Sequence, residues 1–315
     1  MKIFYSGKLM VFFAFLLLYT HYSSGQTPTD GLMMGKGYLC TVFNYSQGNW
    51  QQYWEGPLKR RNENIGTFTT QQFTLMGAYG IGKNLNIIAG LPYIWTHASD
   101  GQLAGQRGFQ DVSVWLKYRF FRTKIAGGNL STFATGGTSL PVSNYVPDFL
   151  PMSIGLGSKT ASLRGIVYYK MNKGFYLTTQ AGYTRRGNIF IDRDAYQYDG
   201  NLYYTNEVQV PDMFDATGKL GFLNNFIQTE IFMDYFTALS GDDIRRNDMP
   251  FPANKMLATS VGWFGKYTYK TNAGEISTTA QVSHVLNGRN VGQTTIFTIG
   301  AQYAFQLVKQ KAAAN

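Results

Sequence analysis

The sequence predicts an all-β protein, an antiparallel transmembrane β-barrel of about twelve strands behind an N-terminal signal peptide. Three observations support this fold class. Apolar and polar residues alternate with period two along most of the chain, polar hinges separate the alternating segments, and the hinges themselves alternate between long and short. Outer-membrane barrels combine short periplasmic turns with longer external loops and an even number of strands. The hinges leave room for about 10 to 14 strands, and about twelve fits them best.

The first residues resemble a secretory signal peptide. Two lysines precede an apolar run at residues 9–19, and small residues follow at 23–25, which is typical of a leader cleaved before Gln26. A run of about eleven apolar residues is too short for a helix that needs about 20 to cross a bilayer. We therefore expect a signal peptide at 1–25 and a single barrel domain at 26–315, with the N- and C-termini of the mature chain in the periplasm.

The composition excludes a helical membrane protein. Hydrophobic residues make up 44% of the chain and the mean hydropathy is −0.19. We therefore expect no membrane-spanning helix after the apolar run of the signal peptide. Aromatic residues at 16%, with 35 glycines and few prolines, suit strands that end in aromatic girdles. The net charge is +10, but the chain has no long basic run and we expect no nucleic acid partner. The expected partners are outer-membrane lipid, lipopolysaccharide phosphates near the outer rim, and the barrel assembly machinery.

Cofactors and metals are not predicted. Cys40 is the single cysteine, which excludes an internal disulfide or a cysteine-rich metal site. Aspartates at 192 and 194, and the pair at 242–243, lack the spaced oxygen ligands of a calcium loop. They read as solvated loop charges.

The hinges give the order of the predicted strands. The long connections, expected outside the cell, lie at 46–66, 97–109, 141–152, 187–210 and 240–254, and 287–293 is intermediate. The short connections, expected in the periplasm, lie at 81–84, 122–127, 171–174, 223–225 and 270–275. Between them, the segment 67–80 and its partner 85–96 alternate clearly, and the second carries a continuous apolar face that a soluble sandwich would not show to water.

The segment 110–121 assigns the two faces of the barrel. Val112, Leu116 and their even-numbered neighbours are apolar, whereas the odd-numbered face carries charges and one tryptophan. A charge at mid-depth in lipid costs about 2–4 kcal/mol, so the charged face must be the lumen. The same argument on the later strands gives the predicted lumen-lining residues, which are Asp111, Trp115, Lys117, Arg119, Arg164, Tyr168, Asp215, Lys219, Glu230, Asp234 and Lys266. Phe232 and Phe264 are predicted to share that face.

The two ends of the mature chain carry weaker signals. The last strand is predicted at 294–307, and a polar tail after Phe305 leaves an aromatic assembly signal internal or altered. Residues 26–33 read as a short periplasmic arm, because nothing in them predicts a helix that would plug the barrel.

Several short motifs resemble those of a known family. Residues 108–118 (GFQDVSVWLKY) are similar to the signature of outer-membrane transporters of the phenol-degradation meta-pathway family, which is distantly related to long-chain fatty-acid channels. The other matching pieces, in the same order as in the family, are 90–93 (GLPY), 139–141 (SLP), 154–157 (IGLG) and 182–186 (GYTRR). The resemblance covers most of residues 67–186. It implies uptake of hydrophobic or aromatic small molecules and no catalytic residues, although the N-terminal hatch of fatty-acid channels has no obvious counterpart here.

An enzymatic reading rests on one pair. His97 and Ser99 are two residues apart, so they share a strand face as the His-x-Ser pair of outer-membrane phospholipase A does. The Asn-Tyr-x-Pro element of that enzyme precedes its pair, whereas here 144–147 follows it. The order is wrong, and we predict that the protein is not an enzyme.

Taken together, the residues predict a channel or transporter for passive uptake of small hydrophobic or aromatic solutes. A barrel of about twelve strands encloses a narrow lumen. In that lumen cations face acidic residues, and ion selectivity is expected to depend on which sign dominates the narrowest level. If the channel is open, Arg119 and Arg164 are expected to shift its preference toward anions. The alternative is a surface binding or structural protein with a closed lumen, in which the same charges pair across a filled interior. Its aromatic external loops would dock ligands or pack into the barrel mouth.

Overall fold

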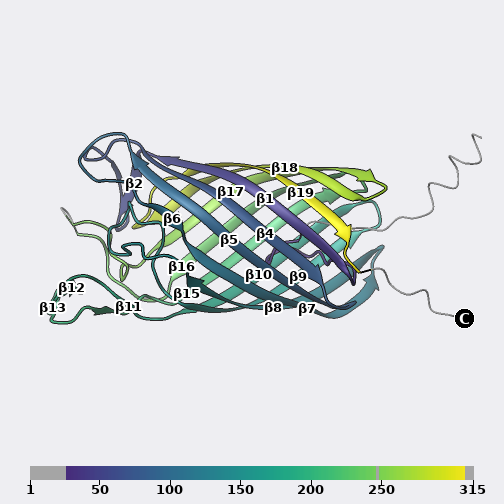
Figure 1. The fold of residues 1–315 in the computed structure, drawn as a ribbon, viewed down its shortest axis with the longest axis horizontal. Coiled ribbons are helices and arrows are strands. Elements are labelled where there is room, and N and C mark those ends of the chain that lie inside the picture. The colour runs from purple at the N-terminus through teal and green to yellow at the C-terminus, as the bar shows by residue number, and fades with distance from the viewer. Residues whose placement is uncertain (1–25, 246–247, 309–315) are drawn as a thin grey trace, which may run out of the picture.

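The computed structural model describes residues 26–245 and 248–308. The predicted signal peptide at 1–25 lies outside the described residues. The main sheet contains 13 strands, one of which is the three-residue β6, and the other twelve form the wall of a closed antiparallel barrel (Figure 1). The predicted fold class and strand number are confirmed. Among the described residues, no helix is long and apolar enough to cross a membrane.

The twelve wall strands are long, with eleven residues or more in each. In chain order they are β1 (Tyr38–Trp50), β4 (Phe68–Gly80), β5 (Leu85–Ala98), β7 (Asp111–Ile125), β8 (Gly128–Pro141), β9 (Thr160–Met171), β10 (Phe175–Arg186), β15 (Met213–Leu223), β16 (Ile227–Ala238), β17 (Leu257–Thr271), β18 (Gly274–Arg289) and β19 (Thr295–Gln306). Each pairs with its neighbour in sequence, and β1 closes the barrel by pairing with β19, with Tyr38 opposite Gln306.

The connections follow the predicted alternation. The short turns join β4 to β5, β7 to β8, β9 to β10, β15 to β16 and β17 to β18, at the end where both described termini lie (Figure 1). We call this the periplasmic end, because outer-membrane barrels place their short turns there. The opposite, external end carries the long loops.

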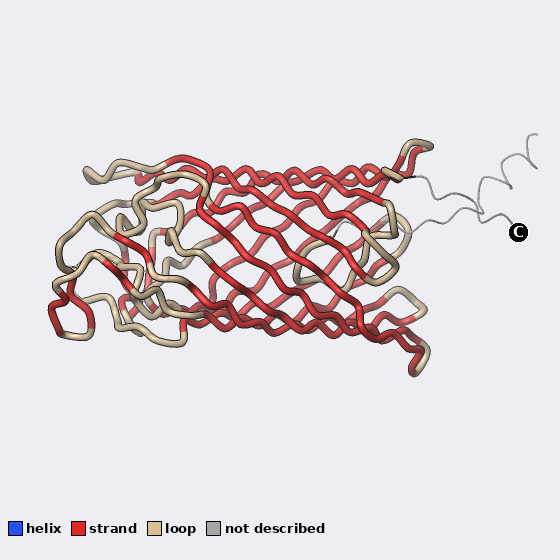
Figure 2. The backbone as a smooth tube through the Cα atoms, turned by 60° about the horizontal axis from the view of Figure 1, so that its bottom comes forward, coloured by secondary structure: helices blue, strands red, loops and turns tan. Residues whose placement is uncertain are grey.

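The external loops contain small sheets that the hinge pattern does not reveal. They are the hairpin of β2 (Gln52–Glu55) and β3 (Leu58–Arg61), the pair β11 (Ile189–Phe190) and β14 (Glu207–Val208), and the hairpin of β12 (Tyr196–Tyr198) and β13 (Asn201–Tyr203). β6 (Arg107–Phe109) adds to β5. Figure 2 shows these loops folded over the external end of the barrel.

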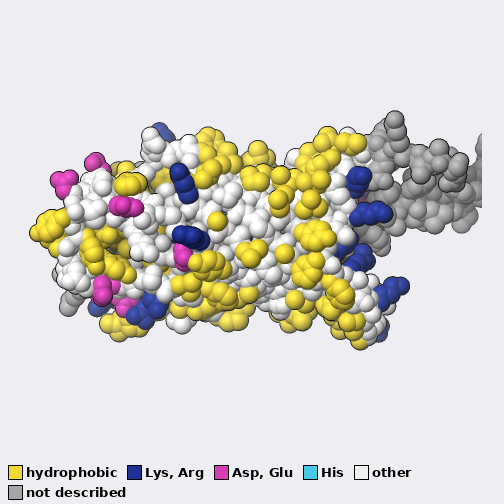
Figure 3. Space-filling model, turned by 90° about the horizontal axis from the view of Figure 1, so that it is seen from below, with side chains coloured by type: hydrophobic (Ala, Val, Ile, Leu, Met, Phe, Trp, Pro, Cys, Tyr) yellow, Lys and Arg dark blue, Asp and Glu magenta, His cyan; other side chains and the backbone are white. Residues whose placement is uncertain are grey.

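The outer surface is apolar along the barrel. Leu116, Leu163 and Ile299 are each at least half exposed, and each lies on the strand face opposite the charged one. Figure 3 shows apolar side chains along the flank, cationic side chains at the periplasmic end and acidic ones among the external loops. The cations on the periplasmic turns include Lys83, Arg122, Lys124 and Lys173, which are exposed.

The N-terminal segment, residues 26–37, lies inside the barrel. Met34 packs against Cys40 and Ala78 on one side of the lumen, and Leu32 packs against a cluster that contains Tyr168 on the other. The prediction that residues 26–33 form a periplasmic arm is therefore wrong, because they lie in the lumen. As expected from the sequence, the segment contains no helix. It crosses the lumen as an irregular chain held by hydrogen bonds, which no helical or strand periodicity could reveal.

Candidate functional site: the barrel lumen

All of the predicted lumen-lining residues lie on inward faces of the wall. Lys117 is fully buried, and Tyr168, Glu230 and Lys266 are buried as well. The others are half-buried, and they contact side chains of nearby strands, of the first periplasmic turn or of an external loop. These are Asp111, Trp115, Arg119, Arg164, Asp215, Lys219 and Asp234. The inward placement follows from strand parity, and two bulges, at Arg119/Phe121 and Thr259/Ser260, do not disturb it for these residues.

Lys117 holds the N-terminal segment in place. Its ammonium lies 2.7 Å from the Asp30 carboxylate and also donates to the backbone carbonyls of Thr27 and Asp30 at 3.2 and 2.5 Å. The phenyl ring of Phe133 faces the same ammonium at 5.3 Å. A buried ammonium requires this number of partners, because an unpaired charge in the interior is costly.

A second buried network surrounds Glu230. Lys219 contacts one carboxylate oxygen at 3.2 Å, and the Tyr176 hydroxyl donates to the other at 2.5 Å. Gln228 donates to the Tyr176 hydroxyl at 3.2 Å. Both oxygens of this carboxylate are therefore satisfied by the wall itself.

Arg164 is paired with an acidic residue, as the closed-lumen alternative expects of the interior charges. Its guanidinium makes two hydrogen bonds to Asp215, at 3.2 and 3.1 Å, and lies over the Trp115 ring at 4.6 Å. Gln180 donates to the same aspartate at 2.9 Å. The pairing arises because β9, β10 and β15 are neighbours and place these side chains on adjacent inward positions.

Arg119 lies beside the first periplasmic turn. It hydrogen-bonds Asn84 at 2.8 Å and the carbonyl of Lys83, both in the first periplasmic turn. It therefore lies at the periplasmic mouth of the lumen. Alternation along a strand predicts which face a residue lies on. Its position along the barrel axis depends on where the neighbouring turns end.

The external mouth is narrowed by the loop that joins β8 to β9. Thr96, an inward residue of β5, donates to the carbonyl of Met152 at 2.6 Å, and Met152 is fully buried. Tyr145 in the same loop donates to Asp111 at 2.6 Å and accepts from the amide of Gly157 at 3.0 Å. Burial raises the pKa of the Tyr145 hydroxyl, and the hydrogen bond to Asp111 adds to the rise. This tyrosine thus stays neutral and holds the loop against the wall.

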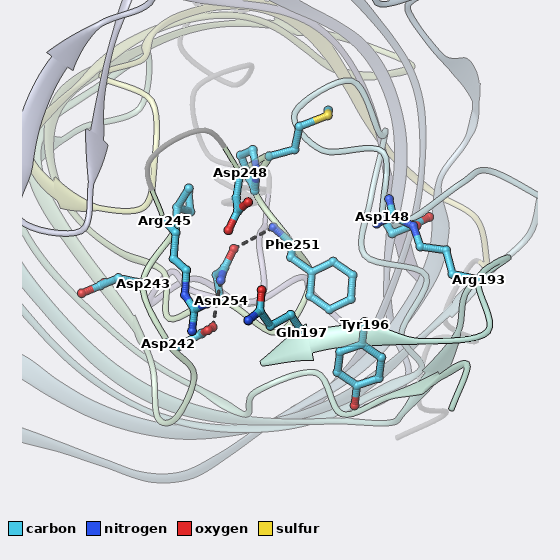
Figure 4. Close-up of a pocket in the computed structure, with 13 residues that line it drawn as sticks. Asp148, Arg193, Tyr196, Gln197, Asp242, Asp243, Arg245, Asp248, Phe251 and Asn254 are labelled. Atoms are coloured by element: carbon cyan, nitrogen blue, oxygen red, sulfur yellow. Dashed lines mark hydrogen bonds and ion pairs between the residues drawn. The ribbon is translucent and has the colours of Figure 1, made fainter. Parts of the chain in front are cut away.

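Three spaces lie in succession from the external end to the periplasmic end. The external pocket, about 280 Å³, lies among the loops and is drawn in Figure 4. There Arg193 pairs with Asp148 at 2.7 Å, and Asn254 bonds to Asp242 at 2.9 Å. Phe251 stacks on Tyr196, with ring centroids 5.4 Å apart.

The two other spaces lie within the wall. The internal cavity, about 120 Å³, is bounded by the N-terminal segment, Lys219, Glu230 and Lys266. The periplasmic pocket, about 460 Å³, opens on the other side of the segment and is lined by Arg119, Arg122, Lys170 and apolar side chains. The N-terminal segment therefore separates the two spaces.

The residues of the enzymatic reading do not meet. His97 is exposed, on the face opposite buried Thr96, and Ser99 bonds to the Thr67 amide at 2.9 Å and to Asp100 at 3.2 Å. In the part of the chain that the structure describes, no hydrogen bond joins His97 to Ser99. Nor does this part contain a group of three histidine, cysteine or acidic residues that could hold a metal.

Sequence reasoning missed several residues of the lumen. Asn86, Tyr176 and Gln180 lie on inward faces. The alternation along their strands would have identified them if uncharged inward residues had been considered as well. Gln26 and Met152 are buried from irregular segments, and no periodic signal marks them.

Comparisons with known proteins agree with this geometry. The model of a family described as "Putative MetA-pathway of phenol degradation" matches residues 62–243. A solved outer-membrane channel from Pseudomonas putida F1 superposes with a TM-score of 0.68 at 12% identity, covering 90% of this chain and 100% of that one. This likeness shows a shared barrel fold.

Two other solved structures are more distant. The KdgM porin in complex with disordered oligogalacturonate gives a TM-score of 0.45 at 9% identity over 84% of this chain and 99% of that chain. The CymD monoaromatic hydrocarbon channel gives 0.40 at 9% identity over 88% of this chain and 90% of that chain. No curated protein matches the sequence significantly.

Proposed function

Because the chain belongs to this phenol-degradation family, we propose that it is an outer-membrane channel through which small hydrophobic or aromatic solutes enter passively. The observation that carries the proposal is the succession of three polar-lined spaces from the external loops to the periplasmic mouth. A barrel that served only as a scaffold would need no such spaces, because side chains can fill a small lumen. Export by the signal peptide would bring the chain to the outer membrane.

The wall chemistry suits amphipathic solutes. Trp115, Tyr168, Phe232 and Phe264 face the interior beside charged residues, so an aromatic ring and a polar group can both find partners. A purely polar wall would favour sugars or salt instead. Stacked aromatics at the external pocket offer a first contact for a ring.

Passage requires that the N-terminal segment moves. It closes the space between the internal cavity and the periplasmic pocket, and Lys117 is its main polar anchor. The segment is irregular and is held by side-chain contacts rather than by a sheet ladder, so it can shift without opening the wall.

The competing reading is a closed barrel that acts through its surface loops. The ion pairs Lys117–Asp30, Arg164–Asp215 and Lys219–Glu230 favour it, because they fill and hold the interior. The two readings differ in conductance.

Single-channel recording of the refolded protein in planar bilayers tests the proposal. We expect small, discrete openings in the wild type, and a larger or more frequent conductance in a variant that lacks residues 27–34. Liposome swelling with the salt of a small aromatic acid and with a neutral disaccharide should favour the aromatic acid, and protein-free liposomes give the background. If the wild type and the variant without residues 27–34 both assemble correctly but do not conduct, the channel hypothesis is wrong and the closed barrel is supported.

A further inference from the structure

Lys266 is a buried cation without a partner. Its exposed fraction is 6%, and in the described part of the chain its ammonium makes no hydrogen bond and no ion pair. It lines the internal cavity. Such a charge is costly unless something pairs with it.

The neighbouring carboxylates are already occupied. Asp30 is held by Lys117 and by amides of its own segment, and Glu230 is held by Lys219 and Tyr176. Near the cavity, Lys117 pairs with Asp30 and Lys219 pairs with Glu230. Lys266 is the third lysine, and no third carboxylate pairs with it among the described residues.

More distant acids do not correct this imbalance. Asp234 lies six residues along β16 from Gln228, which faces Lys266, and at about 3.3 Å per residue this is about 20 Å. Glu275 contacts Lys270 at 3.6 Å and lies four residues along β18 from Thr279, the residue opposite Lys266. The excess positive charge thus stays in the cavity.

The wall beside Lys266 has the form of a site. Strand register places Lys266, Thr279, Gly300 and Asn44 in one row across β17, β18, β19 and β1. Only a glycine fits in this row, since a Cβ there would lie 2.0 Å from Asn44 Oδ1 and 2.6 Å from Thr279 Oγ1, and these two side chains occupy the space over Gly300. A hydroxyl and an amide therefore lie close together over Gly300, and both line the cavity that Lys266 lines.

Other donors and an apolar side complete the lining. Asn44, Thr279 and Gln281 make no hydrogen bonds to other described side chains, so their donors are available to a ligand. Val42 and Met76 form an apolar part of the same cavity. The volume of about 120 Å³ suits a carboxylate of a few carbon atoms rather than a long-chain acid, since a cavity of about 150 Å³ holds a molecule of the size of benzene.

We propose that the internal cavity binds a small organic carboxylate, with the anion paired to Lys266 and hydrogen-bonded by Thr279 and Asn44, and its carbon atoms against Val42 and Met76. This site goes beyond passive entry, because it requires binding but not conduction. It gives the lumen a preference for small acids over neutral molecules of the same size. A halide would share the charge but would leave the apolar side without a partner.

Binding can be measured directly with trifluoroacetate as the probe, by its ¹⁹F NMR linewidth and shift, on the refolded full chain in detergent. We expect saturable binding in the wild type, displaced by acetate at lower concentration than by chloride. Lys266→Met should weaken binding at least tenfold, Thr279→Val severalfold, and Lys266→Arg should retain most of it. Lys173→Met, on an exposed turn, is the matched control and should bind as the wild type does.

The outcomes separate the possibilities. Absence of saturable binding to the wild type, or equal binding by Lys266→Met, would overturn the site. Equal displacement by chloride and acetate would overturn the carboxylate and leave a halide site. Each variant is first checked for heat-modifiable mobility on gels, and Lys266→Arg keeps the test valid if Lys266→Met does not fold. Since no transport is measured, a silent channel would not affect this result.

Discussion

The Lys117 ammonium lies 2.7 Å from the Asp30 carboxylate, and this ion pair joins the wall strand β7 to the segment that crosses the lumen. The lysine is fully buried, whereas the aspartate side chain keeps 13% of its surface exposed. Removing one partner of a buried pair leaves the other charge uncompensated. Breaking this contact therefore tests whether the N-terminal segment is held in the lumen by Lys117.

Lys117→Met should release the N-terminal segment. Loss of one partner of a buried pair costs about 3–5 kcal/mol, and each 1.4 kcal/mol changes an equilibrium about tenfold. Cys40 is fully buried beneath Met34 and reports the movement. Its labelling by a methanethiosulfonate reagent should become about 100-fold faster. The double variant with Asp30→Asn should label more slowly than Lys117→Met alone, and equal rates in wild type and Lys117→Met would refute the anchoring role.

Gly31→Ala should displace the same segment by steric clash. A Cβ at this position would lie 2.2 Å from Cγ of the Tyr168 ring, which is itself buried and cannot retreat freely. Faster labelling of Cys40 is expected again. Gly165→Ala on β9 is the control, because a Cβ there meets nothing within 4 Å. If both variants label like the wild type, the close packing on Tyr168 is not what positions the segment.

Leu116→Arg should impair assembly, because this side chain is 50% exposed on the outer, lipid-facing surface. A charge near mid-depth costs about 2–4 kcal/mol. The yield of the heat-modifiable folded form on gels measures the effect, and Leu116→Ile is the conservative control. Normal assembly of the arginine variant would mean that this face does not meet lipid.

The orientation of the barrel predicts surface labelling. Asn201→Cys lies in the exposed β12–β13 hairpin at the external end, and Lys173→Cys lies in an exposed turn at the other end. On intact cells a membrane-impermeant thiol reagent should label the first and not the second. The wild type, with Cys40 buried, gives the background. Labelling of Lys173→Cys alone would invert the topology.

Acid should loosen one external loop. The hydrogen bond from Arg289 lowers the pKa of the Asp243 carboxyl, and Asn290 and the arginine charge act in the same direction. A lowered folded pKa means that the stabilisation is present above the unfolded value of about 3.9 and is lost as the pH falls through the folded pKa. Protection of the Ile244 amide, which donates to Asn290 at 3.1 Å, should therefore fall in that acidic range when its hydrogen exchange is compared with the intrinsic rate at each pH.

Asp243→Asn provides the control for this pH effect. Its Ile244 amide should be less protected than in the wild type at neutral pH, and this protection relative to the intrinsic exchange rate should show little further change with acid, because the titrating group is gone. An unchanged pH profile in the variant would assign the acid response to another group.

The sequence by itself determined the barrel, its strand order, its two faces and the inward side of Lys117, Arg164 and Lys266. These follow from period two, because each inward position is fixed by its neighbours along the strand and by the cost of charge in lipid. The tertiary structure alone decided which charges pair. Arg164 pairs with Asp215 and Lys117 with Asp30, whereas Lys266 pairs with no carboxylate among residues 26–245 and 248–308. Pairing depends on the register across strands and on an irregular segment that carries no periodic signal.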